Sequence, residues 1–209
     1  WQLNDLKMEL KKSNFPFLSM GGKDDRPTVV YNRTEMCLKA ARYIWDCGCR
    51  NVILLSSEAT IISLPGKEQA VSQVFKDKSS FKVINVAPRS LALEHEEDVI
   101  YENLKNAIPN DRTRLPDAFF CTTPVVSFAL LRLAHERNWT IPDDFMIMGY
   151  ANDMTIRPTT PLLTHVHIPY YEIGKTSCRL LANKILNNMN IPESTIVPAE
   201  LIIGQSTIN

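Results

Sequence analysis

Short apolar runs alternate along the chain with longer segments in which apolar residues recur every three or four positions. The short runs predict strands at residues 15–20, 28–31, 52–55, 81–86, 118–121, 145–148, 163–168 and 200–203. The helical spacing predicts helices over residues 3–13, 35–47, 66–76, 96–108, 125–138 and 170–189. Strands separated by helices of this length favour right-handed crossovers and parallel sheets. The pattern therefore predicts an α/β protein with doubly wound parallel sheets.

Composition and charge narrow the class of protein. The 209 residues carry 23 basic and 23 acidic side chains, and hydrophobic residues make up 44%. A chain that held nucleic acid by itself would carry a basic excess, and this one has a net charge of zero. No apolar run reaches the length of about 18 residues that a membrane helix needs, so we expect no membrane partner.

The first residues, beginning at Trp1, contain no initiator Met, basic segment or apolar segment of a signal peptide. They are typical of the middle of a helix, which favours a true N-terminus upstream.

The cysteines are odd in number and scattered, which favours a reducing cytoplasm over a disulfide framework. They lie at Cys37, Cys47, Cys49, Cys121 and Cys178. Cys47 and Cys49 form the one close pair, and the four histidines have no spacing that would complete a tetrahedral metal site around them. We therefore expect helix-end and turn positions for this pair, and no metal.

No catalytic motif is present in the sequence. The glycine-rich phosphate loops and the Gly-x-Ser-x-Gly elbow are both absent. The carboxylate pairs at residues 96–97 and 143–144 stand where capping acids are expected, and neighbours in sequence point in different directions. The sequence predicts neither an enzyme nor a cofactor.

A family resemblance rests on several stretches that occur in order. They are residues 30–32 (VYN), 48–53 (GCRNVI), 116–121 (PDAFFC), 141–150 (IPDDFMIMGY), 161–174 (PLLTHVHIPYYEIG) and 201–207 (LIIGQST). Together they resemble the effector-binding core of bacterial transcription regulators of the lactose-repressor (LacI/GalR) family. The resemblance covers the whole chain with about the right spacing.

The resemblance implies a two-lobed, periplasmic-binding-protein-like (type I) fold whose lobes exchange strands at three crossovers. Residues 1–32 and 164–190 would then form an incomplete N-terminal lobe with an open strand edge. Residues 33–163 and 191–209 would form the C-terminal lobe. The family's DNA-binding head and the first elements of its N-terminal lobe would precede Trp1.

In that family a small molecule, commonly a sugar or a purine, binds between the lobes and changes their angle, and a homodimer then presents its heads differently to operator DNA. Such coupling requires that the ligand bind the two lobe arrangements with different affinity. Ligand contacts are expected where strands end at their carboxyl edge. The candidate effector-binding residues are Gly21, Ser57, Lys67, Arg89, Thr122, Thr123, Asn152 and Asp153.

Five positions depart from the family pattern of polar ligand contacts. Gly21 and Ala151 stand where Asp is usual, Pro124 where Asp or Asn is usual, and Ile168 where Gln is common. Lys67 replaces an Arg, and an ammonium group lacks the planar fork that bonds a ligand at two points. The effector is therefore unusual, or neighbouring polar residues replace these contacts, or small-molecule sensing has been lost.

Some of these residues have a plainer interpretation beside the functional one. Lys67 is either a ligand contact or a solvated charge at a helix start, and Asn152 and Asp153 are either ligand contacts or loop caps. Tyr170 and Tyr171 suit an aromatic sugar box, although packing on the sheet is favoured for both.

Three functions remain open. The favoured one is the effector-sensing and dimerisation core of a cytoplasmic DNA-binding regulator that responds to a sugar or a related molecule. The alternative is a periplasmic sugar-binding protein of a transporter, which the free cysteines and the regulator-like segment at residues 169–174 disfavour. An enzyme on a doubly wound sheet is third, because no catalytic constellation is present.

Overall fold

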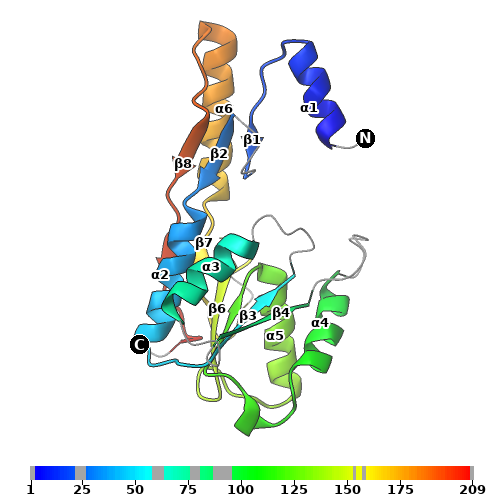
Figure 1. Cartoon of the computed structure of the whole chain (residues 1–209), viewed down its shortest axis with the longest axis vertical. Coiled ribbons are helices and arrows are strands. Elements are labelled where there is room, and N and C mark those ends of the chain that lie inside the picture. The colour runs from blue at the N-terminus through cyan, green and yellow to red at the C-terminus, as the bar shows by residue number, and fades with distance from the viewer. Residues whose placement is uncertain are drawn as a thin grey trace. The chain divides into compact units, whose positions relative to one another are not determined.

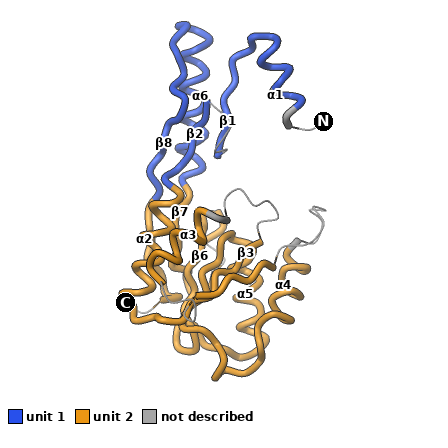
Figure 2. Tube along the Cα trace, in the orientation of Figure 1, with its two compact units in different colours: residues 1–32, 169–199 blue, residues 33–168, 200–209 orange. Residues whose placement is uncertain are grey.

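The computed structural model describes residues 3–21, 27–57, 64–75, 81–86, 96–152, 154–156 and 159–207. The chain forms an α/β fold in which helices and strands alternate (Figure 1). It divides into two compact units, which are coloured separately in Figure 2. Unit 1 comprises Trp1–Asn32 and Pro169–Ala199, and unit 2 comprises Arg33–Ile168 and Glu200–Asn209.

Unit 1 is a small parallel sheet that packs against one long helix. Its elements are α1 (Leu3–Lys12), β1 (Ser19–Met20), β2 (Thr28–Tyr31), α6 (Tyr170–Asn187) and β8 (Ser194–Val197). The described strands lie in the order β1-β2-β8 and are all parallel. Helix α6 packs against β1 and β2, and Ile173 of α6 and Val29 of the central strand are buried.

Unit 2 is a six-stranded sheet with helices on both faces. Its helices are α2 (Arg33–Asp46), α3 (Leu64–Val74), α4 (Glu96–Ala107), η1 (Arg112–Arg114) and α5 (Pro124–Glu136). Its strands are β3 (Val52–Ser56), β4 (Phe81–Asn85), β5 (Ala118–Cys121), β6 (Met146–Ala151), β7 (Thr164–His167) and β9 (Glu200–Ile202). The described strands lie in the order β4-β3-β5-β6-β7-β9, and β9 alone among them is antiparallel to its neighbour.

The alternation of side chains along β5 supplies both layers of the core. Phe119 and Cys121 point into the apolar cluster that the sheet forms with α4 and α5. Phe120 points to the opposite face, where its ring stacks on Tyr150 of β6 with centroids 5.9 Å apart. Every residue of β5 and β6 is buried, as expected for central strands of a sheet that helices cover on both sides.

The predicted α/β class with parallel sheets is confirmed, and the structure corrects three details. Strand β8, between Pro192 and Pro198, was not predicted, because its four residues are partly exposed and mixed in polarity. Strand β9 is antiparallel, whereas only parallel strands were expected.

The third correction concerns two segments that lie in the opposite units from those predicted. Residues 164–168 belong to unit 2, because β7 pairs with β6 along its length. Residues 191–199 belong to unit 1, because β8 pairs with β2 from Thr28 to Tyr31. The remaining prediction of an incomplete N-terminal lobe stays a prediction.

Tyr170 and Tyr171 at the start of α6 were expected to pack on the sheet, and this expectation was wrong. Their side chains are 58% and 76% exposed. The first turn of a helix directs successive side chains around its whole circumference, and here Ile173 occupies the buried direction instead.

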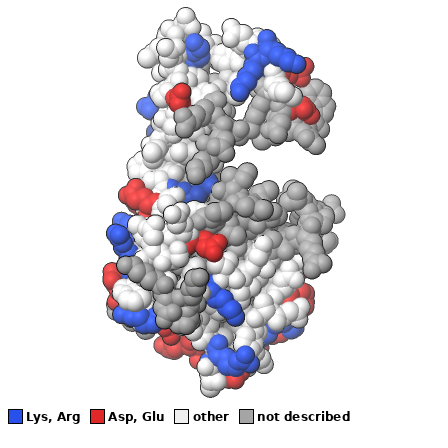
Figure 3. Space-filling model, in the orientation of Figure 1, with Lys and Arg blue, Asp and Glu red and all other residues white. Residues whose placement is uncertain are grey.

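The surface carries both signs of charge. On the face drawn in Figure 3, basic and acidic side chains are interspersed over the described residues. This agrees with the equal numbers of acidic and basic residues in the sequence. Within the part of the chain that the structure describes, no helix combines the length and the apolar character needed to cross a bilayer.

Candidate functional site

Strands β3, β5 and β6 of unit 2 are parallel neighbours, so their carboxyl ends lie at one edge of the sheet. The predicted residues Ser57, Thr122, Thr123 and Asn152 follow directly after these strands. In doubly wound sheets this edge is where ligands bind. Ser57, Lys67, Thr122, Thr123 and Tyr150 are joined there by direct contacts and are called the carboxyl-edge cluster below.

Two hydroxyls of the cluster bond to each other. The Ser57 Oγ and Thr123 Oγ1 atoms lie 2.9 Å apart. The backbone amide of Thr122 donates to the carbonyl oxygen of Leu55 at 2.9 Å, which continues the β3–β5 ladder beyond the end of β5. Hydrogen bonds of the sheet therefore fix the backbone beside these hydroxyls.

Lys67 lies in the first turn of α3 but is not a solvated charge. Its residue is only 5% exposed, and its ammonium group donates to the carbonyl oxygen of Thr122 at 3.1 Å. The same nitrogen lies 4.7 Å from the centroid of the Tyr150 ring, a cation–π distance. The interpretation of Lys67 as a solvated helix-start charge was therefore wrong. Its position within the cluster leaves ligand contact as a prediction.

The hydroxyl of Thr122 is the unusual group of the cluster. The residue is 3% exposed, and its Oγ1 has no hydrogen-bond partner among the residues that the structure describes. Buried hydroxyls in folded proteins are nearly always bonded. An unbonded one at the ligand-binding edge of a sheet is therefore a candidate for a hydrogen bond to a ligand.

The N-terminus of helix α5 adds further donors beside this hydroxyl. Thr123 is the N-cap residue of α5, but its side chain makes no capping hydrogen bond. The first N–H groups of a helix have no partner within the helix, and the N-terminal end carries partial positive charge. Pro124 at the first helical position lacks an N–H, so the amides of Val125 and Val126 are the first that can donate.

Asn152 caps a turn. Its side-chain oxygen accepts from the backbone amides of Met154 at 2.9 Å and Thr155 at 3.1 Å. Its own amide donates to the Thr155 hydroxyl at 2.9 Å. The structure therefore favours the loop-capping interpretation of Asn152.

The contacts that define the cluster involve four of the eight predicted site residues, Ser57, Lys67, Thr122 and Thr123. Gly21 lies in unit 1 after β1, with a φ of 83°, a conformation that glycine adopts more readily than Asp would. Arg89 and Asp153 lie outside the described residues. Ligand binding by any of the predicted residues stays a prediction.

The departures from the family pattern have structural reasons. Ala151 ends β6 and is 1% exposed, and Ile168 is 7% exposed and donates its amide to the Ala151 carbonyl at 2.8 Å. Pro124 starts helix α5, where its fixed φ is favourable. Two of these positions are thus packed as apolar core and one initiates a helix.

Two buried cysteines of unit 2 have thiols with raised pKa values. Burial raises the pKa of the Cys121 thiol, at the end of β5, to about 12. Burial, with a smaller effect of Asp117, raises the pKa of Cys49 to about 12, and its sulfur lies 3.6 Å from that of Met146. Asp117 already accepts from the backbone amides of Arg50 and Asn51. Within the described residues no three His, Cys, Asp or Glu side chains converge as metal ligands.

Sequence reasoning missed Tyr150 as a site residue. It was noted only as part of the segment 141–150. Nothing near it in the sequence signals the contact with Lys67, because α3 and β6 are far apart in the chain and meet only in the folded sheet.

A family model described as a periplasmic binding protein-like domain matches residues 41–207. The chain belongs to this family. Its matched region contains every member of the carboxyl-edge cluster, so the cluster is part of the family domain.

Relatives are regulators of transcription. The chain is 25% identical over 186 residues to the transcriptional repressor PurR of Mannheimia succiniciproducens, covering 87% of this chain and 53% of that protein. It is 23% identical over 207 residues to the transcriptional regulator GalR of Streptococcus thermophilus, covering 96% of this chain and 61% of that protein. The chain thus spans little more than half the length of these relatives. The predicted resemblance to lactose-repressor-type regulators is confirmed.

A solved structure with the same fold is a LacI family transcriptional regulator from Enterococcus faecium with bound ribose. The TM-score is 0.81 at 19% sequence identity, over 99% of this chain and 75% of that chain. At this identity the likeness establishes the fold, which is the periplasmic-binding-protein-like fold predicted from the sequence.

Proposed function

We propose that the chain is the effector-sensing core of a transcription regulator and that a small molecule, in the first instance a carbohydrate, binds at the carboxyl-edge cluster. Membership of the periplasmic binding protein-like family and the regulators among its relatives support the role. The bound ribose of the Enterococcus faecium protein supports the ligand class. The relatives are regulators, so a transport function is not favoured.

The observation that carries the site is the buried Thr122 hydroxyl, which lacks a partner among the described residues. A ligand hydroxyl could bond to it, and the Ser57–Thr123 pair and the first amides of α5 offer further hydrogen bonds. A polar ligand in a partly dry site needs several such groups to replace its hydration.

The partners of the whole protein belong to the same proposal. The relatives are helix-turn-helix regulators. We therefore assign operator contact to a head of that kind, and homodimerisation would present two heads to a palindromic site. The free cysteines support a cytoplasmic location, and the relatives support a role without catalysis.

A thermal-shift titration tests the proposed ligand site. The purified protein is titrated with ribose, other sugars, sugar phosphates and purines, and a ligand that binds the folded state stabilises it by about 2.7 kcal/mol at a hundredfold excess over its Kd. Thr122→Val removes the hydroxyl with little change of shape and should weaken binding by about tenfold.

Ser72→Ala provides the matched control. Ser72 lies on α3 with Lys67, and its hydroxyl donates to the Gln69 carbonyl of its own helix and to no other group of the described residues, so binding should not change. Failure of every compound to shift the melting temperature would contradict the proposed sensing function. A ligand that binds Thr122→Val as tightly as wild type would move the site elsewhere.

A further inference from the structure

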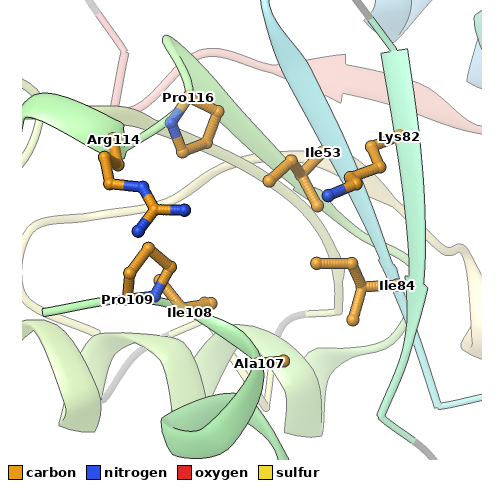
Figure 4. Close-up of a pocket in the computed structure, with 8 residues that line it drawn as sticks. All are labelled: Ile53, Lys82, Ile84, Ala107, Ile108, Pro109, Arg114 and Pro116. Atoms are coloured by element: carbon orange, nitrogen blue, oxygen red, sulfur yellow. The ribbon is translucent and has the colours of Figure 1, made fainter. Parts of the chain in front are cut away.

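A pocket opens on unit 2 beside strands β3 and β4 (Figure 4). Its volume is about 180 Å³. Ile53 and Ile84 of the two strands form one wall, and Ile108 and Pro109 form another where the chain leaves helix α4. The pocket therefore has an apolar lining on two sides.

Helix α4 ends beside this pocket. The helix stops at Ala107, and Pro109 cannot continue it. The chain then passes through η1 before it enters β5, and Arg114 of η1 and Pro116 line the pocket together with the end of α4. Ile53 and Ile84 pack against the core of unit 2 and remain only half-buried.

Two positive charges face this apolar space. Figure 4 shows the guanidinium group of Arg114, from η1, and the ammonium group of Lys82, from β4, directed toward the same pocket. Neither side chain forms an ion pair with any described residue. The carboxylate of Asp111 is near Arg114 but accepts from the amide of Thr113 at 3.0 Å and from its hydroxyl at 2.8 Å. Those bonds, and to a lesser degree Arg114, lower the pKa of Asp111.

Two cations that converge without a carboxylate between them repel each other, and an anion placed between them relieves that repulsion. Arg in particular bonds a carboxylate at two points. Burial of the apolar walls under a hydrocarbon group would also make the free energy of binding more favourable. A cavity of about 150 Å³ is large enough for one benzene ring, so this pocket has room for a single ring or a short branched chain.

We propose that this pocket binds a small organic monoanion with a compact apolar body, such as an aromatic carboxylate. Its carboxylate lies between Arg114 and Lys82, and its ring lies against Ile53 and Ile84. The site is independent of the carboxyl-edge cluster, because Ile53 lies near the start of β3 and Ser57 lies just beyond its end.

Benzoate is the probe, and benzyl alcohol is its neutral counterpart of nearly the same shape. Binding to the purified protein is measured by isothermal titration calorimetry and thermal shift at constant ionic strength, adjusted with chloride. Benzoate should bind saturably and at least about tenfold more tightly than benzyl alcohol, because only benzoate gains charge-assisted hydrogen bonds.

Arg114→Gln and Lys82→Gln should each weaken benzoate binding by about tenfold without changing the melting temperature of the free protein, since both side chains are exposed and unpaired. Lys105→Gln is the matched control. Lys105 lies on α4 close to the pocket but is paired with Glu136 at 3.1 Å, so benzoate binding should not change.

Three results would overturn the proposal. The first is the absence of saturable benzoate binding to the wild-type protein. The second is equal binding of benzoate and benzyl alcohol, which would show a pocket without preference for an anion. The third is benzoate binding that both glutamine variants retain in full, which would place the ligand elsewhere. None of these results bears on ligand binding at the carboxyl-edge cluster.

Discussion

Two sets of buried side-chain hydroxyls in unit 2, one beside β7 and one at the carboxyl end of β5, differ in their hydrogen bonds. Beside β7, the Ser206 hydroxyl accepts from the amide of Thr164 at 2.8 Å and donates to the Ile147 carbonyl at 2.6 Å. The Thr164 hydroxyl bonds to that of Thr207 at 2.7 Å, which bonds to Tyr43 at 3.1 Å. At the end of β5, the equally buried Thr122 hydroxyl has no partner among the described residues.

The comparison separates buried hydroxyls that are bonded within the fold from one that has no partner among the described residues. The hydroxyls beside β7, here called the hydroxyl network, join β6 and β7 to residues 204–207, and each has hydrogen-bond partners within the fold. Groups of that kind stabilise one arrangement of the chain and cannot serve a ligand. In the carboxyl-edge cluster the Thr122 hydroxyl has no such bond among the described residues, which costs stability, and under the proposed function a bound ligand would supply the missing bond.

The largest effect is expected at Gly204, where the hydroxyl network meets the end of β9. A Cβ there would overlap the Leu162 carbonyl oxygen and would lie 2.6 Å from the carbonyl carbon and oxygen of Leu163. Because all of these are backbone atoms, Gly204→Ala should lower the free energy of unfolding by about 3 kcal/mol.

Urea denaturation measures this loss, and Gly174→Ala is the control. A Cβ on Gly174, within α6, meets nothing within 4 Å, so that variant should gain about 0.5 to 1 kcal/mol from helix propensity. A loss below about 1 kcal/mol for Gly204→Ala would mean that residues 204–207 shift easily and that the network is not rigid.

Ser206→Ala should have the next largest effect. The substitution removes the acceptor of the Thr164 amide and a donor to the Ile147 carbonyl, and both of these groups are buried. The expected loss of unfolding free energy is about 2 kcal/mol, again by urea denaturation, against a change within about 0.5 kcal/mol for Ser72→Ala. Equal stability of the two variants would contradict a structural role for the network.

Thr164→Val should cost less, about 1 to 2 kcal/mol. The substitution keeps the volume but removes the hydroxyl that accepts from the Gly204 amide at 2.9 Å and bonds to Thr207. Amide hydrogen exchange provides the local readout, because the Gly204 amide should lose protection while amides of α5 keep theirs.

Thr122→Val should have the smallest effect on stability and the opposite sign. Removing an unbonded buried hydroxyl leaves the free energy of unfolding unchanged or raises it by up to about 1 kcal/mol. The direct comparison with Thr164→Val is the decisive measurement, since both replace a buried Thr at a strand in the same sheet. If the two variants lose equal stability, the Thr122 hydroxyl is bonded and the distinction between the two regions fails.

Strands made of buried apolar residues could be predicted from the sequence, and the short, partly exposed strand β8 could not. Strand β5 has the predicted bounds, residues 118–121, because all four residues are buried and apolar. Strand β8 was missed and β7 was placed in the wrong unit. Both carry polar residues, and their partners, β2 for β8 and β6 and β9 for β7, are remote in the chain.

For the candidate site, the sequence indicated the positions but not their roles. The rule that ligands bind after parallel strands selected Ser57, Thr122 and Thr123, and the structure brings these residues together. It could not distinguish a bonded hydroxyl from an unbonded one, because that depends on which side chains the folded sheet brings within about 3 Å.

The sequence by itself determined the α/β class, the lack of catalytic motifs and the resemblance to regulators, because periodicity, motif spacing and composition are properties of local sequence. Only the tertiary structure decided that Lys67 is a buried cation over Tyr150, that Asn152 caps a turn, and that Lys82 and Arg114 face one apolar pocket. Each of these facts depends on contacts between strands and helices that are distant in sequence. Such contacts are set by the order of strands in the sheet, which no local pattern records.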